Sequence, residues 1–145
     1  MKKLLITIAL LSCAGVAVSA YALWQHYAPL GAAFCNLNES FSCDLVNKSA
    51  YSEFLGIPVA GIGIAGYVVL GVLAIALVVQ PGWRASVLPV FLTAALGGLG
   101  FAAYLTYVEF FVIGAYCILC IVSQVLIIGI AGSSLLVWKH QSHPV

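Results

Sequence analysis

Four of the five cysteines fall into two pairs whose spacing suits disulfide chemistry. Cys117 and Cys120 form a Cys-Ile-Leu-Cys motif, and residues three apart share one face of a helix. Free backbone N–H groups at a helix start stabilise a thiolate, the nucleophile in thiol–disulfide exchange. Cys35 and Cys43 are separated by seven residues in CNLNESFSC, a polar stretch that has no proline or glycine. This second pair favours a redox-active role for the first.

Two other interpretations of the four cysteines stay open at this point. Four thiolates can hold one tetrahedral zinc ion, although the Cys35–Cys43 spacing is long for a zinc knuckle and the other pair lies in apolar sequence. The pairs can also be two inert structural disulfides in a membrane module without catalytic activity. The fifth cysteine, Cys13, lies in the middle of an apolar run, and we interpret it as a small packing residue.

The composition indicates the kind of protein that must position these cysteines. Of the 145 residues, 64% are hydrophobic and 6% are charged, against about 25% charged in a soluble domain. Four apolar runs without Lys, Arg, Asp or Glu are each close to the ~20 residues that cross a bilayer. They cover residues 4–23, 61–79, 88–107 and 117–137. The sequence therefore predicts one membrane domain over residues 1–145, an all-α bundle of four transmembrane helices.

The charges predict the orientation of the bundle and its compartment. Four of the five basic residues lie on one side of the predicted spans, at Lys2, Lys3, Arg84 and Lys139. The acids and Lys48 lie on the other side with both cysteine pairs. The positive-inside rule then puts both termini in the cytoplasm and the cysteines outside, where disulfides persist. Cleavage of residues 1–20 as a signal peptide is the alternative, and it leaves the directions of the other spans unchanged. So few scattered basic residues argue against nucleic-acid binding.

Two features near the cysteines point to a covered site within the bundle. The segment after Cys43, DLVNKSAYSEFLGIPVAG, predicts a short interfacial helix that ends before Gly56 and Pro58. Such a helix would cover the mouth of the bundle, or it would simply lie on the membrane surface. Gln124 follows Cys120 by four residues on the same helical stripe, and an amide within the membrane needs a partner. A quinone carbonyl would be one partner, and a hydrogen bond to another helix is the alternative.

These motifs together resemble the vitamin K epoxide reductase family, in particular its small bacterial members. The resemblance is carried by Cys35-x7-Cys43, by Ser49, by SEFLGIPVAGIGIAGY and by Cys117-Ile-Leu-Cys120, and it covers most of the chain. DsbB-type oxidases also have four helices and two cysteine pairs, but their pairs come in the reverse order. Animal members of the family carry Tyr where this chain has Gln124, so reduction of vitamin K epoxide is not inferred.

The resemblance implies a function and a role for each site residue. It implies a quinone, ubiquinone or menaquinone, bound near the outer face of a bacterial cytoplasmic membrane. Cys35 would react with a thioredoxin-fold (DsbA-type) thiol oxidase, Cys43 would exchange with Cys117, and Cys120 would face the quinone. Ser49 matches a Ser or Thr near the family's site. The expected result is a quinone-coupled thiol–disulfide oxidoreductase that supports disulfide formation in exported proteins.

Overall fold

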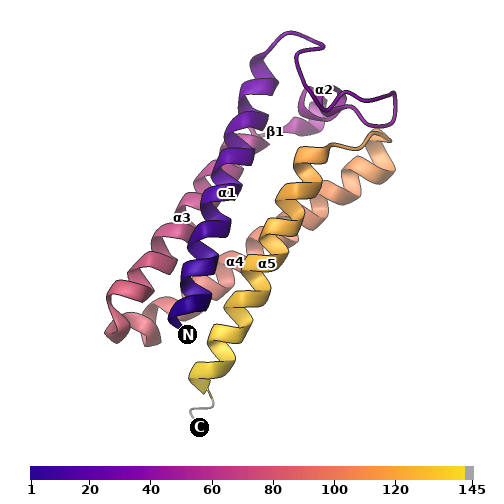
Figure 1. Cartoon of the computed structure of the whole chain (residues 1–145). Coiled ribbons are helices and arrows are strands. Elements are labelled where there is room, and N and C mark those ends of the chain that lie inside the picture. The colour runs from indigo at the N-terminus through magenta and orange to yellow at the C-terminus, as the bar shows by residue number, and fades with distance from the viewer. Residues whose placement is uncertain (143–145) are drawn as a thin grey trace.

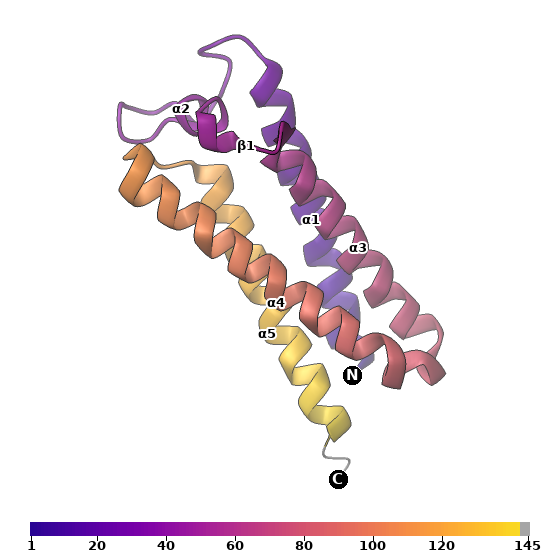
Figure 2. The same ribbon diagram turned by 180° about the vertical axis from the view of Figure 1, so that it is seen from behind.

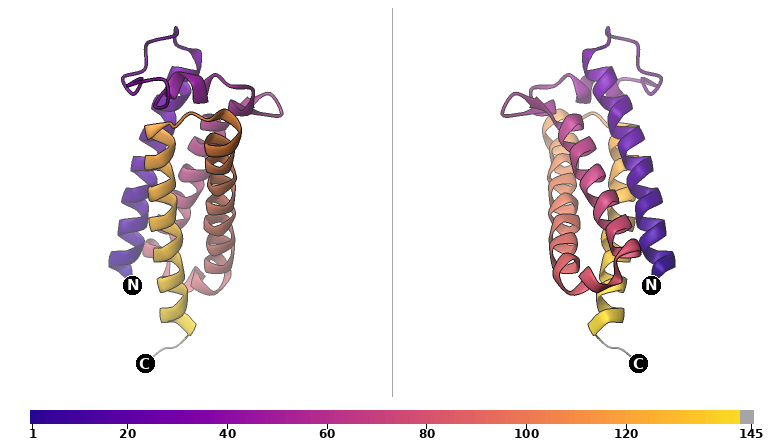
Figure 3. Two further views of the ribbon diagram at one scale, coloured as in Figure 1. Left: turned by 90° about the vertical axis from the view of Figure 1, so that its right-hand side faces the viewer. Right: turned by 90° about the vertical axis from the view of Figure 1, so that its left-hand side faces the viewer.

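Four long helices form an antiparallel bundle in this computed structural model, which describes residues 1–142 (Figure 1). Each is long and apolar enough to cross a membrane, as the sequence predicts. They are α1 (Lys2–Tyr27), α3 (Val59–Val79), α4 (Arg84–Val108) and α5 (Ile118–Ser142). The start of α1 and the end of α5 lie at one end of the bundle, and the 28–58 segment covers the other (Figure 3). The protein is therefore a mostly helical, integral membrane protein.

The helices run further than the apolar runs that predicted them. α1 extends over Lys2–Tyr27 rather than 4–23, and α5 continues to Ser142 rather than ending at 137. An apolar run marks the part of a helix within hydrocarbon, whereas backbone hydrogen bonding continues into the polar interface. A 3₁₀ turn, η2 (Pro81–Trp83), joins α3 to α4 at the end that holds the termini (Figure 2).

Close packing between α1 and α3 depends on small residues of α1. Gly15 faces the ring of Tyr67, and Ser12 faces Gly71. Across the bundle, the Tyr67 hydroxyl forms a hydrogen bond with the Ser123 hydroxyl of α5, with an O···O distance of 2.8 Å. The interpretation of Cys13 as a packing residue is wrong, because its side chain is exposed and its neighbour Ser12 makes the contact. Apolar spacing alone did not show which face of α1 meets α3.

Replacing Gly15 by alanine should destabilise the bundle. A Cβ atom there would lie 2.6 Å from Cγ of Tyr67, and overpacking of a filled core costs about 1–3 kcal/mol. Thermal unfolding in detergent should show a lower midpoint for Gly15→Ala. Gly132→Ala is the matched control, since a Cβ at that glycine of α5 meets nothing within 4 Å. Equal midpoints for the two variants would contradict the predicted packing.

The segment between α1 and α3 is more irregular than the sequence predicted. Its helix, α2 (Cys43–Asn47), starts at Cys43 itself, because the Ser42 hydroxyl accepts a hydrogen bond from the Leu45 amide at 3.3 Å. It ends after five residues and is followed by a 3₁₀ turn, η1 (Ala50–Ser52). A two-stranded hairpin, β1 (Glu53–Phe54) and β2 (Ile57–Pro58), leads into α3. The interfacial helix is therefore present but much shorter than expected.

Two glycines at positive φ form tight turns, one within this segment and one between α4 and α5. Gly56 has φ +79° and Leu55 has φ +52°, which is the two-residue turn that closes a tight hairpin. At the end of α4 the chain widens into a π-helical turn, η3 (Glu109–Ile113), and Gly114 at φ +70° stops it. That turn directs the following residues, including Cys117, back over the bundle.

Candidate active site

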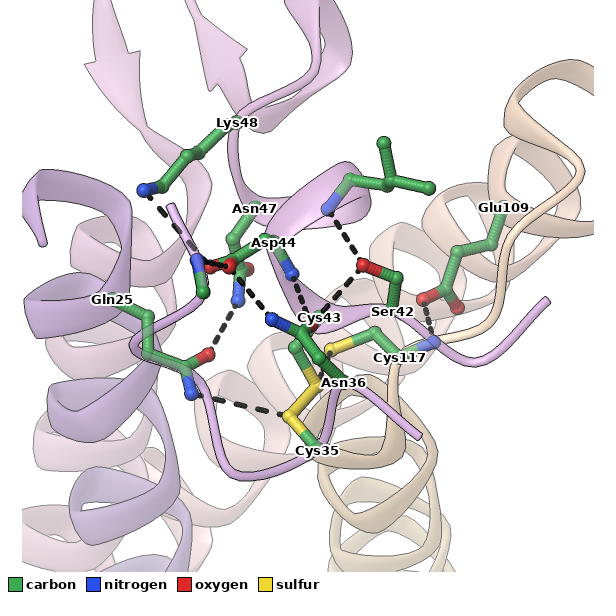
Figure 4. The surroundings of a disulfide bond; sticks show 12 residues. Gln25, Cys35, Asn36, Ser42, Cys43, Asp44, Asn47, Lys48, Glu109 and Cys117 are labelled. Carbon is green, nitrogen blue, oxygen red and sulfur yellow. Dashed lines mark hydrogen bonds and ion pairs between the residues drawn. A yellow bond between two sulfur atoms is a disulfide. The ribbon is translucent and has the colours of Figure 1, made fainter. Parts of the chain in front are cut away.

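The structure brings three of the four predicted site cysteines into direct contact. Cys35 and Cys43 form a disulfide, with their Cα atoms 5.7 Å apart. The Sγ atom of Cys117 lies 3.4 Å from Sγ of Cys43, as Figure 4 shows. All three side chains are at most 1% exposed. A free thiol therefore lies next to a disulfide in a pocket that excludes water, where thiol–disulfide exchange needs little movement.

Cys117 and Cys120 sit at the start of α5, although not as the sequence suggested. The sequence predicts both in the first turn of this helix, and Cys120 lies there. Cys117 instead precedes α5, which begins at Ile118, and its carbonyl accepts the first helical hydrogen bond from Ile121 N at 3.0 Å. The pKa of the Cys117 thiol lies below its ordinary value, chiefly because it is hydrogen-bonded to the Cys120 thiol. Cys117 is thus the more readily ionised and more nucleophilic of the two.

A buried aspartate, Asp44, holds the loop that carries Cys35. Its Oδ2 atom accepts hydrogen bonds from the Gly31 amide at 2.6 Å and from the Asn36 side chain at 2.7 Å. Asn36 Oδ1 in turn accepts from the Asp44 amide at 3.2 Å and from the Ser42 hydroxyl at 3.1 Å. Figure 4 shows these bonds gathered around the disulfide. The polar loop is thereby fixed over the bundle.

Backbone and aromatic contacts fix the position of this loop against the start of α5. The Tyr116 amide donates to the carbonyl of Ser40 at 2.7 Å, and Phe41 and Tyr116 form an isolated β-bridge. The rings of Phe41 and Tyr116 lie 5.4 Å apart at their centroids. Phe41 lies two residues before Cys43, and Tyr116 lies one residue before Cys117. The bridge therefore holds Sγ of Cys43 close to Sγ of Cys117.

The end of α1 supports the other half of the disulfide. Gln25 is fully buried, and its Nε2 atom lies 3.9 Å from Sγ of Cys35. Its Oε1 atom accepts from the Asn47 side chain at 3.1 Å, which ties α1 to α2. His26 also contacts this region, with Nδ1 2.6 Å from the Asn47 carbonyl and Nε2 3.2 Å from Glu53. Sequence analysis did not single out Gln25, since a single amide at a span end carries no motif.

Glu109 is the most important site residue that sequence analysis missed. It is 3% exposed, and its Oε1 atom accepts a hydrogen bond from the Cys117 amide at 2.9 Å. A carboxylate oxygen of Glu109 and the sulfurs of Cys117 and Cys120 all lie within 4.8 Å of one another. In the sequence, Glu109 is one of several acids outside the predicted spans. Only the π-helical turn η3 and the turn at Gly114 show that it folds back onto the cysteines.

A cavity of about 560 Å³ opens beneath the cysteines and among the four long helices. Most of its lining is apolar, and Glu109 and Cys120 are among the polar residues that contribute to its wall. Gln124 lies deeper in the same cavity. Ser49 also lines it, but its hydroxyl donates to the Val46 carbonyl at 2.9 Å and makes no hydrogen bond to a cysteine within residues 1–142.

The structure supports both interpretations of Gln124 in part. Its Oε1 atom accepts a hydrogen bond from the Thr106 hydroxyl of α4 at 3.4 Å, which is the helix–helix contact. Within residues 1–142 its amide nitrogen makes no hydrogen bond, although the side chain borders the cavity. That N–H group is thus free to donate to a ligand carbonyl.

The size and the mostly apolar lining of the cavity are those of a pocket for a small ligand. Pockets for small ligands usually measure about 300–1,000 Å³, with mostly apolar walls and a few polar groups that orient the ligand. The Cys120 thiol and the Gln124 amide supply a sulfur and a donor on one stripe of α5, one helical turn apart.

The arrangement argues against the two other interpretations of the cysteines. Two inert structural disulfides would not need to touch, whereas Sγ of Cys117 lies 3.4 Å from Sγ of Cys43 in the loop disulfide. A four-thiolate zinc site would require Cys35 and Cys43 as thiolates, whereas they are bonded to each other. One oxidised pair and one reduced pair in contact is the arrangement expected of an exchange reaction.

Comparison with known families agrees with this geometry. The model of the vitamin K epoxide reductase family matches residues 6–135. The matched region includes both cysteine pairs, Glu109, Gln124 and most of each long helix. The chain therefore belongs to the vitamin K epoxide reductase family and is a membrane thiol oxidoreductase.

Proposed function

We propose that the protein oxidises a thioredoxin-fold partner and passes the electrons through both cysteine pairs to a membrane quinone. The observation that carries this proposal is the 3.4 Å separation between Sγ of Cys43 and Sγ of Cys117. It connects the loop disulfide to a second dithiol whose other member, Cys120, borders the cavity. Two pairs in contact, one facing the loop side and one facing a ligand cavity, form a relay.

The relay consists of exchange steps in which each new disulfide replaces an old one. A thiolate of the partner attacks Cys35, and the partner's second thiol then releases an oxidised partner and a reduced Cys35–Cys43 pair. The Cys43 thiolate attacks Cys117 of the Cys117–Cys120 disulfide, and Cys120 leaves as a thiolate. Cys35 then attacks Cys43, which restores the loop disulfide and leaves Cys117 and Cys120 reduced. The structure corresponds to this last state.

The second pair must then be reoxidised at the cavity. A bound quinone supplies a two-electron, two-proton acceptor. Cys120 and Gln124 would hold and orient its ring, while the apolar walls and the covering loop keep water away. Formation of the Cys117–Cys120 disulfide removes two electrons and two protons from the thiols. Whether the quinone is ubiquinone or menaquinone depends on the membrane that supplies it.

The proposed location is a bacterial cytoplasmic membrane, with the cysteine pairs on the outer side and both termini in the cytoplasm. The positions of Lys2, Lys3, Arg84 and Lys139 support this orientation, since they lie at the start of α1, the start of α4 and the last turn of α5, opposite the end that carries the cysteine pairs. An oxidising outer compartment would hold the partner, whose two thiols must reach Cys35 from the loop side.

Quinone reduction by the purified, pre-reduced protein in detergent tests the proposed function. Quinone absorbance is followed while free thiols are alkylated at each time point and counted by mass spectrometry. We expect one quinone to be consumed for each Cys117–Cys120 disulfide formed. Thiols that reoxidise only in air, with quinone unchanged, would overturn the proposal.

Replacing Gln124 by leucine should weaken quinone binding with little effect on the chemical step. The variant removes the amide that faces the cavity but keeps a side chain of similar size, and one hydrogen bond is worth about 1 kcal/mol. We expect KM for a short-chain quinone to rise about five- to tenfold while kcat stays similar. Gln80→Leu, at the far end of α3, is the control. An unchanged KM for Gln124→Leu would show that Gln124 does not bind the quinone.

A further inference from the structure

The relay requires a group that removes a proton from the dithiol within a site whose walls are mostly apolar. The sulfur atoms of Cys117 and Cys120 lie within 4.8 Å of one another, and one thiol proton remains on the pair when Cys117 is ionised. That proton must leave before a disulfide can form. Cys117 is fully buried against the loop disulfide, and Cys120 is partly buried in the wall of the cavity, so a neighbouring side chain is the nearest acceptor for this proton.

Glu109 is the one carboxylate that the structure places at this position. Its oxygen lies within 4.8 Å of both sulfurs, and it borders the same cavity as Cys120. From α2, Asp44 is the other acid near the cysteines, but it does not line the cavity, and its Oδ2 atom accepts hydrogen bonds from Gly31 and Asn36. The titratable side chains at this end of α4 are Tyr104 and Tyr107, and Cys43 of α2 is held in the disulfide.

We propose that Glu109 is a catalytic proton acceptor that takes the proton of Cys120 as the Cys117–Cys120 disulfide forms and delivers it toward the ligand cavity. This inference rests on the proposed function, because the quinone is the electron acceptor. Two electrons leave the sulfurs as the S–S bond forms, and the quinone is reduced to quinol. One proton travels from Cys120 through Glu109, and the second, which Cys117 lost on ionising, returns from water.

A purely structural role for Glu109 makes a different prediction. Its Oε1 atom accepts from the Cys117 amide, so Glu109 also caps the start of α5. The amide oxygen of glutamine can accept the same hydrogen bond, but a glutamine cannot take up a proton. Glu109→Gln therefore separates capping from proton transfer, and Glu109→Asp keeps the carboxylate if the glutamine variant folds poorly.

Two readouts on Glu109→Gln should move in opposite directions. Quinone reduction by the pre-reduced protein should fall about 100-fold, because general base catalysis is worth about 10²–10⁴. Alkylation of Cys117 at fixed pH should become faster, because the charge of Glu109 opposes thiolate formation at Cys117. Glu109→Asp should recover part of the quinone rate, and Glu39→Gln, which alters an exposed acid of the loop, should change neither readout.

Each outcome separates this inference from the proposed function. If the wild-type protein leaves quinone unchanged, the proposed function fails and the inference fails with it. If the wild type is active and Glu109→Gln is within about twofold of it, only the proton-acceptor role fails. Slower quinone reduction together with slower alkylation and a lower unfolding midpoint would also overturn the proton-acceptor role. Glu109 would then act only as a cap at the start of α5.

Discussion

Replacing Cys120 by serine is expected to abolish quinone reduction, with a loss of about 10³-fold or more. The variant loses the sulfur that borders the cavity and the partner with which Cys117 forms a disulfide. Neither reoxidation of the dithiol nor its contact with a quinone can then occur. The rate is measured with pre-reduced protein as above. Cys13→Ser is the matched control, since that cysteine lies on an exposed face of α1 and should leave the rate unchanged.

A double variant shows which cysteines exchange between the pairs. Cys35→Ser with Cys120→Ser keeps Cys43 and Cys117, the two whose sulfurs lie 3.4 Å apart. Without their usual partners, these two should oxidise to one disulfide, which peptide mapping under non-reducing conditions detects. A protein that instead stays reduced, or forms disulfides only between molecules, would show that the two segments do not meet as described.

Replacing Asp44 by alanine should slow transfer between the two pairs about 100-fold. Asp44 accepts two hydrogen bonds, from Gly31 and Asn36, that fix the loop carrying Cys35, and Lys48 lies 3.9 Å from its other oxygen. Hydrogen bonds to a charged group are each worth about 1.5–3 kcal/mol. A loosened loop would displace the disulfide from Cys117, and a shift of about 1 Å in reacting atoms can cost 10²-fold.

The rate of exchange between the pairs measures this effect separately from quinone reduction. Protein with a reduced loop pair and an oxidised Cys117–Cys120 pair is quenched with acid at short times and its disulfides are mapped. Asp44→Ala should show slow transfer, whereas the control Glu39→Ala, an exposed acid of the same loop, should match the wild type. Equal rates in both variants would mean that the Asp44 network does not position the disulfide.

The number of long helices and their alternation along the bundle could be predicted from the sequence, because each apolar run is long enough to cross the bilayer. Their ends could not, since helical hydrogen bonding continues past the hydrocarbon and α1 runs from Lys2 to Tyr27. The helix after Cys43 was overestimated for a different reason. Ser49 bonds back to the Val46 carbonyl, and Leu55-Gly56 form a tight turn, so the chain leaves the helix early.

The candidate site was only partly accessible to sequence reasoning. Cysteine spacing indicated the two pairs and their chemistry, and Gln124 was found because an amide within a span needs a partner. Glu109, Asp44 and Gln25 were missed, because nothing in the local sequence distinguishes a buried polar residue from a solvated one. Their burial depends on the π-helical turn, on Gly114 and on the loop that folds over the bundle.

The central claim is that electrons pass between the two pairs through Cys43 and Cys117. The most direct test treats the oxidised wild-type protein with a small dithiol in the presence of quinone, quenches it with acid over time, and maps every disulfide. The account predicts a transient Cys43–Cys117 disulfide that appears before quinol accumulates and decays as Cys117–Cys120 is reoxidised. Steady formation of quinol with Cys35–Cys43 intact throughout, or a transient that links Cys35 to Cys117 instead, would contradict it.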